Sequence, residues 1–231
     1  RSINQGCGTI LTVKQVDSAA CQLGKKRVLC ESYGCTGGDF SFRGRKWIGD
    51  WLYVLGVNLN NPHLSLYSMR GERKRDYPAN IFFPQPWWGE NRLVADYFAR
   101  LSYALSEGKR VVDVMVIHPI SSAWTRYRPD STGPVGILDE SLAKLEKVLL
   151  NNQRDFHYGD EMLMEKHGSV ESGEDGAVLR IGEMSYRVVI IPPSHTLSCS
   201  TAAMLRKFAS AGGKILAVPP LPTELEGVAV S

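Results

Sequence analysis

The sequence predicts an α/β protein in which strands and helices alternate along the chain. Two segments, 111–117 and 187–191, are nearly continuous apolar runs, which is typical of strands buried on both faces of a parallel sheet. Amphipathic helical patterns, such as the one at 93–105, lie between such runs, and Gly or Pro follows most elements. We therefore expect parallel sheets covered by helices.

The first 108 residues are predicted to form one domain. A helix is expected at 13–23, where apolar residues recur at helical spacing before a glycine, and a strand at 27–31 ends on Glu31. A second helix follows at 45–55, and alternating leucines predict a strand at 63–68. This order of elements is typical of a parallel barrel or a doubly wound sheet.

A proline-containing segment and a long helix complete this first domain. Segment 77–88 contains three prolines and is expected to be an ordered loop. The helix at 93–105 has one apolar face and stops at Gly108, where we place the domain boundary.

The pattern restarts at Lys109 and predicts a second domain at 109–231. Strands alternate here with helices, as in a flavodoxin-like open parallel sheet. The strands are expected at 111–117, 155–158, 177–181, 187–191 and 214–218, and the helices at 137–150, 160–167 and 200–211.

Composition excludes several classes of protein. The chain has 231 residues, of which 43% are hydrophobic and 22% charged, as in folded globular proteins. A net charge of +3 with scattered Lys and Arg argues against nucleic-acid binding, and no apolar run is long enough to span a membrane. Five cysteines without a C-x-x-C pair argue against a zinc ribbon or a disulfide scaffold. Because the chain starts at Arg1 rather than Met, we expect a piece of a longer protein, whose location the sequence does not assign.

Glu31 is the strongest candidate for a catalytic group. In parallel α/β barrels, catalytic side chains lie at the C-terminal ends of strands. Hydrolysis of a glycosidic bond needs two carboxyl groups, one that protonates the leaving oxygen and one that acts as nucleophile or as base on water. Glu31 can supply one of them. Nearby alternatives are Asp39, Asp50, Glu72 and Asp76.

Aromatic, amide and imidazole side chains are dense around Glu31. Sugars pack their C–H faces on aromatic rings and need fixed donors and acceptors for their hydroxyls. For each such residue the alternative is a structural role, in the core or in a loop hydrogen bond. The candidates for substrate binding are Tyr33, Asn58, His63, Tyr67, Trp87, Trp88 and, from a loop of the second domain, Trp124.

Several long motifs resemble one family. The runs CESYGCTGG, RKWIGDWLYVLGVN, PHLSLYSMRGERKRDYP and PWWGENRLVADYFARLSYALSEGK, followed by VVDVMVIHPISSAW, resemble the C-terminal part of the catalytic region of bacterial glycoside hydrolases. The resemblance is strongest to α-L-rhamnosidases of family 106, and the layout is similar to that of family 42 β-galactosidases. It implies the C-terminal portion of a (β/α)8 barrel followed by a flavodoxin-like, or amidotransferase-like, open sheet.

The resemblance also implies roles. Glu31 would be the catalytic carboxylate of a late barrel strand, acting as base or nucleophile, while the general acid would lie on an earlier strand outside this chain. Family 106 favours inversion and implies a calcium ion near the site, although no D-x-D-x-D run exists here and no other cofactor motif is present. We expect this chain alone to be inactive, because a whole barrel takes roughly 250 residues.

Two other functions stay open. In a non-catalytic carbohydrate-binding or scaffolding protein, Glu31 would only hydrogen-bond a sugar. In an amidotransferase-like enzyme the second domain would need a reactive Cys, for which Cys199 is a candidate. Since that domain shows no nucleotide-binding motif, we expect it to be structural or to join copies of the chain into a homo-oligomer.

Overall fold

The structure is a computed structural model that describes residues 7–74, 81–173 and 176–230. Asp76 and the first part of the loop predicted at 77–88 lie outside the described residues. The chain divides into two compact units, each treated by itself below. The Glu31 unit is Lys25–Lys109, and the sheet unit combines the chain up to Gly24 with Arg110–Ser231.

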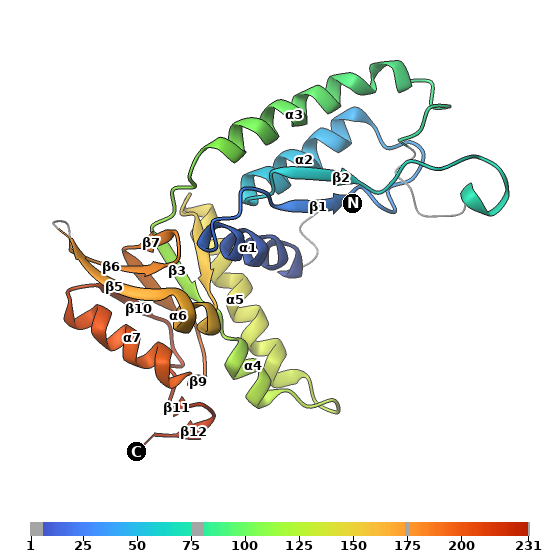
Figure 1. Cartoon of the computed structure of the whole chain (residues 1–231). Coiled ribbons are helices and arrows are strands. Elements are labelled where there is room, and N and C mark those ends of the chain that lie inside the picture. Colours follow the sequence, from blue (N-terminus) through green and yellow to red (C-terminus); the bar gives the residue numbers. More distant parts are fainter. Residues whose placement is uncertain (1–6, 75–80, 174–175, 231) are drawn as a thin grey trace. The chain divides into compact units, whose positions relative to one another are not determined.

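The Glu31 unit is built on a two-stranded parallel sheet. β1 (Leu29–Ser32) pairs with β2 (Leu59–Pro62), and α2 (Phe42–Leu55) connects them (Figure 1). Two 3-10 turns, η2 (Gly71–Lys74) and η3 (Trp88–Glu90), precede α3 (Asn91–Glu107). Ser41 caps the start of α2, since its hydroxyl accepts a hydrogen bond from the Gly44 amide, and Gly56, with φ of 127°, caps its end.

α2 and α3 pack closely because a glycine stands at their contact. A Cβ atom at Gly49 would come within 2.1 Å of the Phe98 ring. Tyr53 of α2 packs on the same ring, with 5.2 Å between centroids, and its hydroxyl lies 2.7 Å from Ser102 Oγ on α3. Leu52, Tyr53 and Leu55 of α2 and Phe98 of α3 are buried and belong to the hydrophobic core of the unit.

The sheet unit contains a four-stranded parallel sheet. Its strands are β3 (Val114–Ile117), β4 (Phe156–Gly159), β8 (Val188–Ile191) and β10 (Lys214–Ala217), in the spatial order β10-β8-β3-β4. Taken in chain order this is 2-1-3-4, the order found in flavodoxin-like sheets. Strands were predicted at all four places, two of them as apolar runs. The strand predicted at 177–181 lies instead in a separate antiparallel sheet, as β6.

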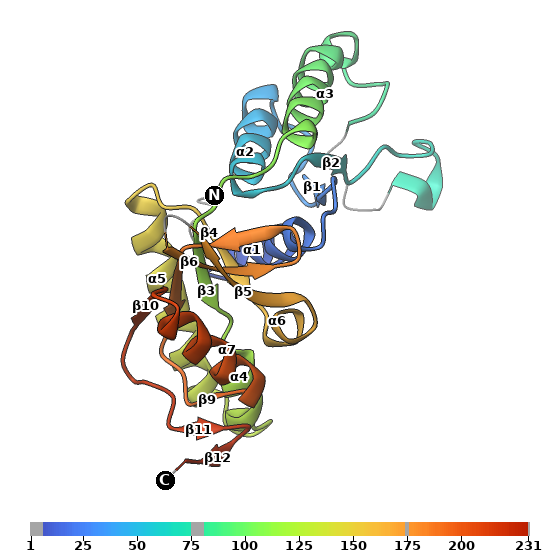
Figure 2. The ribbon, with the colours of Figure 1, turned by 60° about the vertical axis from the view of Figure 1, so that its left-hand side comes forward.

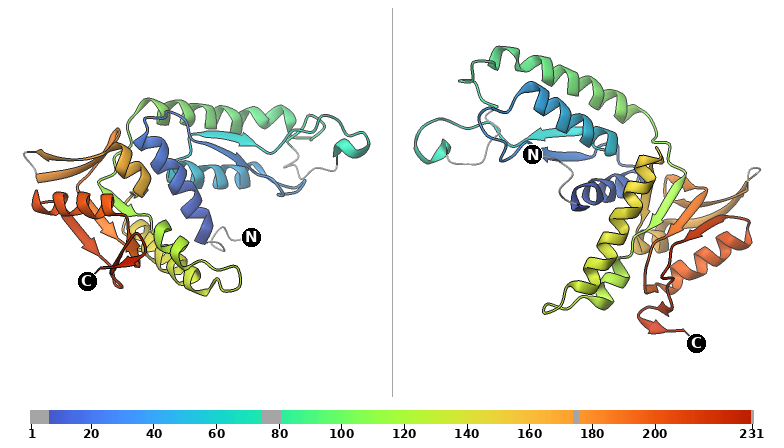
Figure 3. Two further views of the ribbon diagram at one scale, coloured as in Figure 1. Left: turned by 60° about the horizontal axis from the view of Figure 1, so that its bottom comes forward. Right: turned by 180° about the vertical axis from the view of Figure 1, so that it is seen from behind.

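Helices cover both faces of this sheet (Figures 2 and 3). α5 (Gly133–Asn151) packs through Leu142 on Val116 and Ile190 of one face. On the other face, α7 (Cys199–Ser210) packs with an antiparallel sheet of β5 (Gly168–Gly173), β6 (Gly176–Ile181) and β7 (Met184–Tyr186). The remaining elements are α4 (Ile120–Arg126), α6 (Glu161–His167), β9 (Thr196–Leu197), β11 (Glu224–Leu225) and β12 (Val228–Ala229).

The first helix, α1 (Cys7–Gln22), belongs to the sheet unit. It packs on β4 and α5, although the sequence placed it in the first domain. The reason is a set of long-range polar contacts, described below, which a pattern of local spacing does not reveal. The Glu31 unit is thus inserted, in sequence, between α1 and the rest of the unit to which α1 belongs.

Other differences concern short segments. The strand predicted at 63–68 is wrong: β2 lies earlier, and residues 63–68 have no strand neighbour. β3 begins at Val114, three residues later than predicted, and Val111 is 84% exposed. Trp124, expected in a loop, lies instead in α4. Within the described residues, no helix combines the length and the apolar character that crossing a bilayer requires.

Candidate functional site

Glu31 lies one residue before the end of β1, and its side chain is exposed. Parallel register places Glu31 beside Asn61 and Leu29 beside Leu59. Because side chains alternate along a strand, these four share one face of the sheet. Leu29 is 54% exposed and Leu59 37% exposed, so this face, which we call the Glu31 face, presents apolar groups beside a carboxylate.

The opposite face holds a chain of hydrogen bonds under the end of β1. Ser32 Oγ donates to Asn60 Oδ1, and Asn60 Nδ2 donates to the Tyr33 hydroxyl at 2.6 Å. That hydroxyl donates in turn to the carbonyl of Arg45 on α2 at 3.1 Å. Burial raises the pKa of Tyr33 to about 12, so the phenol stays protonated at neutral pH.

The polar groups of Tyr33 and Asn58 are therefore already hydrogen-bonded within the unit. The Tyr33 ring is 6% exposed and packs against Ile81 and Phe40. The Asn58 amide accepts from the Val28 backbone N–H and donates to the Lys26 carbonyl, both at 2.8 Å. In this structure both side chains fix the start and the end of β1.

His63 lies beside the turn that follows β1. Its backbone N–H donates to the Ser32 carbonyl at 2.7 Å, and a Cβ atom at Gly34 would come within 3.5 Å of its Nδ1. The imidazole is half-buried. Of the predicted substrate-binding residues outside the core, His63 is the one that these contacts bring to the end of β1.

The aromatic candidates differ in exposure. Trp87 packs edge-on against Phe42, with centroids 5.3 Å apart, and lies under the Arg45 guanidinium. Trp88 is 39% exposed and Tyr67 is 88% exposed, so both rings present area to a ligand. Trp124 stands on α4 in the sheet unit and is 64% exposed.

Among the other carboxylates, Asp50 already accepts hydrogen bonds within the unit. It accepts from Lys46 Nζ at 2.5 Å and from the Tyr97 hydroxyl at 2.8 Å on the outer side of α2 and α3. Asp39 is exposed in the loop after β1, and Glu72 lies in η2. The described residues of the Glu31 unit contain no group of three His, Cys, Asp or Glu side chains arranged to hold a metal.

Comparison with known proteins gives an informative likeness among solved structures. No family model matches the chain, and no curated protein matches it. Among solved structures, the chain is similar to Gan42B, described as a GH42 β-galactosidase, with a TM-score of 0.59 and 11% sequence identity. The match covers 100% of this chain and 33% of that one, so the chain spans a third of its length. This likeness shows the fold alone.

The fold is thus mixed α/β with parallel sheets and is like that of a glycoside hydrolase. This likeness shows neither a complete barrel nor a relation to α-L-rhamnosidases.

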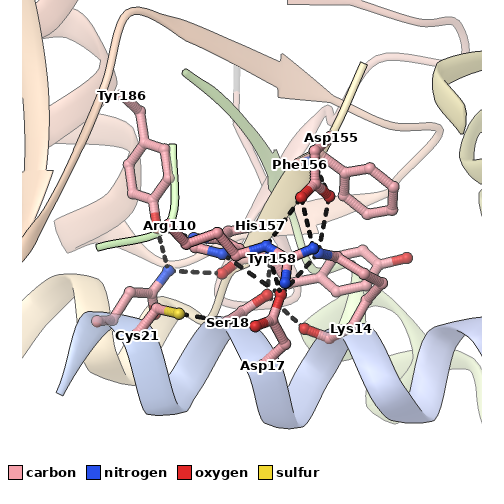
Figure 4. A network of polar contacts seen from close by, with 11 residues as sticks. Lys14, Asp17, Ser18, Cys21, Arg110, Asp155, Phe156, His157, Tyr158 and Tyr186 are labelled. Carbon is pink, nitrogen blue, oxygen red and sulfur yellow. Dashed lines mark hydrogen bonds and ion pairs between the residues drawn. The ribbon is translucent and has the colours of Figure 1, made fainter. Parts of the chain in front are cut away.

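The sheet unit contains a buried polar network that was not predicted from the sequence (Figure 4). Lys14 of α1 is fully buried, and its ammonium donates to Asp17 at 2.7 Å and to Asp155 at 2.9 Å. Arg110 binds Asp155 at 2.7 Å and lies 3.5 Å from Asp17. Two cations thus face two carboxylates, and the four charges balance.

His157 extends this network toward β7. Its Nε2 lies 3.5 Å from Asp17, and its Nδ1 lies 2.9 Å from the Tyr186 hydroxyl, which also accepts from Gln22 of α1. Burial lowers the pKa of His157, which favours the neutral imidazole. Burial alone would raise the pKa of Asp17, but His157, Lys14 and Arg110 outweigh it and hold this pKa at about 2.

Asp17, Cys21 and His157 are also close enough together to hold a metal ion. The chemistry argues against one, because Lys14 and Arg110 already neutralise Asp17. Burial and the neighbouring Asp17 carboxylate raise the pKa of Cys21 to about 12, so its thiol is protonated. We interpret the network as the anchor of α1 to the sheet.

Flavodoxin-like sheets bind ligands at the carboxyl ends of strands such as β3 and β8, and here the segments that follow these two strands are hydrogen-bonded to each other. The Ser122 hydroxyl accepts from the backbone N–H groups of His195 and Thr196, at 2.9 and 3.0 Å. The same hydroxyl donates to the Thr196 carbonyl at 3.2 Å. Cys199, the candidate for amidotransferase chemistry, is exposed at the first position of α7.

Two signals in the sequence could have revealed the network. Lys14 and Asp17 stand three residues apart on a helix that also carries Val13 and Val16, and His157 stands between Phe156 and Tyr158 in a strand. Charged groups at buried positions indicate partners elsewhere in the chain.

Proposed function

We propose that this chain is part of a glycoside hydrolase in which Glu31 supplies one of the two catalytic carboxyl groups. The observation that carries the proposal is the Glu31 face. There an exposed carboxylate stands near the C-terminal end of a parallel strand, beside Leu29 and Leu59, which the unit leaves uncovered. The likeness to a GH42 β-galactosidase supports the reaction class.

The apolar part of this face fits a barrel interior. In a (β/α)8 barrel, inward residues of neighbouring strands pack against each other in layers, and the carboxyl ends of the strands form the active site. Leu29 and Leu59 would pack against further strands of the parent protein, while Glu31, two residues nearer the carboxyl end than Leu29, would face the substrate. Residues 25–108 would then be the C-terminal portion of that barrel.

The reaction would be hydrolysis of a glycosidic bond through an oxocarbenium-like transition state. Glu31 would act as base on water, or as nucleophile, and the general acid would come from an earlier strand of the parent protein. The distance between the two carboxyl groups decides the stereochemistry of the product. A distance of about 5–5.5 Å gives retention of the anomeric configuration, and roughly 6.5–9.5 Å leaves room for water and gives inversion. The resemblance to family 106 favours inversion and an α-L-rhamnosidase.

Around this carboxylate, His63, Trp88 and Tyr67 are the proposed contacts with the sugar. His63 adjoins the end of β1, and the two rings are exposed. Tyr33 and Asn58 would support the site from behind, because their polar groups are already paired within the unit. A calcium ion near the site remains an implication of the resemblance alone.

The test is a pair of glutamate variants in the parent protein. Glu31→Gln keeps the shape of the side chain and removes its charge, so we expect turnover of an aryl glycoside to fall by about 10³-fold or more, with sugar binding nearly unchanged. Glu90→Gln, an exposed carboxylate of η3, is the matched control and should leave turnover unchanged. Turnover of an aryl α-L-rhamnoside and of an aryl β-D-galactoside should be measured side by side, to distinguish an α-L-rhamnosidase from a β-galactosidase.

The second candidate is a carbohydrate-binding or scaffolding protein without catalysis. The exposure of Trp88 and Tyr67 suits it equally well. Under this hypothesis, Glu31→Gln would weaken sugar binding and turnover would be absent from the wild-type parent. If Glu31→Gln reduces sugar binding and turnover equally, or reduces neither, the catalytic assignment of Glu31 is wrong.

A further inference from the structure

The connection between α4 and α5 in the sheet unit forms a pocket that the proposed active site does not use. Its volume is about 340 Å³, within the range of roughly 300–1,000 Å³ that small-molecule sites occupy. The lining residues are Thr125, Arg126, Arg128, Asp130, Ser131 and Pro134. All of them belong to one continuous segment of chain.

The shape of this segment is fixed by its own contacts. The Ser131 N–H donates to the Arg128 carbonyl at 3.1 Å, which closes a tight turn. At one end, Arg126 forms an ion pair with Glu224 of β11, and Thr125 Oγ1 donates to the Ser122 carbonyl at 3.0 Å. The pocket is therefore formed before any ligand arrives, which lowers the entropic cost of binding.

Two exposed aromatic residues belong to the same segment of chain, although neither is a lining residue of the pocket. Trp124 directly precedes Thr125 and is 64% exposed, and Tyr127 lies between two lining residues and is 57% exposed. Trp124 lies in the last turn of α4, and Tyr127 directly follows the end of this helix, three residues later. Exposed rings of this size are ready platforms for the C–H face of a sugar.

The polar lining matches hydroxyl groups better than an ion. Arg126 also lines the pocket but is already paired with Glu224. Of the other polar groups, Arg128 offers only donors, Asp130 only acceptors, and Ser131 both. A pyranose presents neighbouring hydroxyls that donate and accept at once, whereas an anion or a cation would meet one group of its own sign. We propose that Trp124, Tyr127 and this pocket form an accessory carbohydrate-binding site, separate from the Glu31 face.

This inference rests on the proposed function, since a carbohydrate hydrolase supplies the ligand class. An accessory site would hold a chain of the same polysaccharide or oligosaccharide on which the parent acts. Affinity for one or two sugar rings on an open platform of this kind is expected to be in the millimolar range.

The test uses the 231-residue chain and observes its tryptophan indole N–H signals by NMR during titration with galactobiose and with methyl α-L-rhamnopyranoside. We expect a saturable shift of the Trp124 signal, which Trp124→Phe identifies. Trp124→Ala and Arg128→Ala should each weaken binding about tenfold, or abolish it. The matched control, Tyr103→Ala on α3, removes a ring that is 68% exposed and should leave binding unchanged.

The outcomes separate this site from the proposed catalytic site. Binding that survives Trp124→Ala, together with turnover of the parent protein that Glu31→Gln abolishes, would overturn the accessory site and leave the proposed function standing. Saturable binding at Trp124 in a chain whose parent shows no turnover would support the site and sink the catalytic proposal. The absence of any saturable shift would overturn the accessory site. Concentration-dependent self-association that Trp124→Ala removes would instead assign these rings to contact with a second copy of the chain.

Discussion

The network around Asp17 makes the sharpest prediction about stability. Asp17→Asn keeps the volume of the side chain and removes the charge that faces Lys14, Arg110 and His157. Lys14 is fully buried and would keep only Asp155 as a charged partner. The variant therefore leaves positive charge in excess inside the sheet unit, which is costly in a low-dielectric interior.

The pKa of Asp17 gives the size of the effect. Its fall from 3.8 to about 2 corresponds, at about 1.36 kcal/mol per unit, to roughly 2.5 kcal/mol of stabilisation by the ionised form. The Asp17 side chain is only 2% exposed, so solvent screening removes little of this. We expect Asp17→Asn to lower the free energy of unfolding of the sheet unit by about 2–3 kcal/mol at pH 7.

The assay is urea unfolding, followed by circular dichroism, of wild type, Asp17→Asn and the control Glu171→Gln. Glu171 pairs with Arg180 at 3.5 Å on the surface of the same unit, with both side chains more than 40% exposed, so its loss should cost at most about 1 kcal/mol. The double variant Lys14→Met with Asp17→Asn should cost less than the sum of the two single variants, since it removes both charges together.

The pH dependence has a definite sign. Because the pKa of Asp17 is lower in the folded state, its contribution is complete above 3.8 and is lost as the pH falls toward 2. The stability difference between wild type and Asp17→Asn should therefore shrink over that window. A constant difference from pH 5 to pH 2, or a cost no larger than that of Glu171→Gln, would refute the idea that this network anchors α1.

Two further predictions concern the Glu31 unit. Gly49→Ala should destabilise this unit by about 1–3 kcal/mol in urea unfolding, because the new methyl group would meet the Phe98 ring. The control Gly89→Ala, where no atom lies within 4 Å of the added methyl group, should be nearly neutral. Equal destabilisation by the two variants would contradict the packing argument. Tyr33→Phe should cost about 1–3 kcal/mol, since Asn60 and the Arg45 carbonyl lose their partner, and Tyr103→Phe is the exposed control. An unchanged unfolding midpoint in Tyr33→Phe would show that this hydroxyl is not structural.

The sequence alone determined the elements whose pattern is strong and local. Buried strands such as β3 and β8 are nearly continuous apolar runs, and helices α3, α5 and α7 have one apolar face with a glycine or an equivalent stop. These patterns predicted the parallel sheet of the sheet unit. They also placed Glu31 near the end of a parallel strand, because an apolar run followed by a polar turn marks the carboxyl end of a strand.

Only the tertiary structure decided which faces and partners these elements have. Lys14 and Asp155 meet across 141 positions of the chain, so no local period could assign α1 to the sheet unit. Likewise, Tyr33 and Asn58 look like sugar-binding residues in sequence but are buried and paired. Polar side chains gain their role from the groups that folding brings to them, whereas apolar periodicity is set by the geometry of each helix or strand.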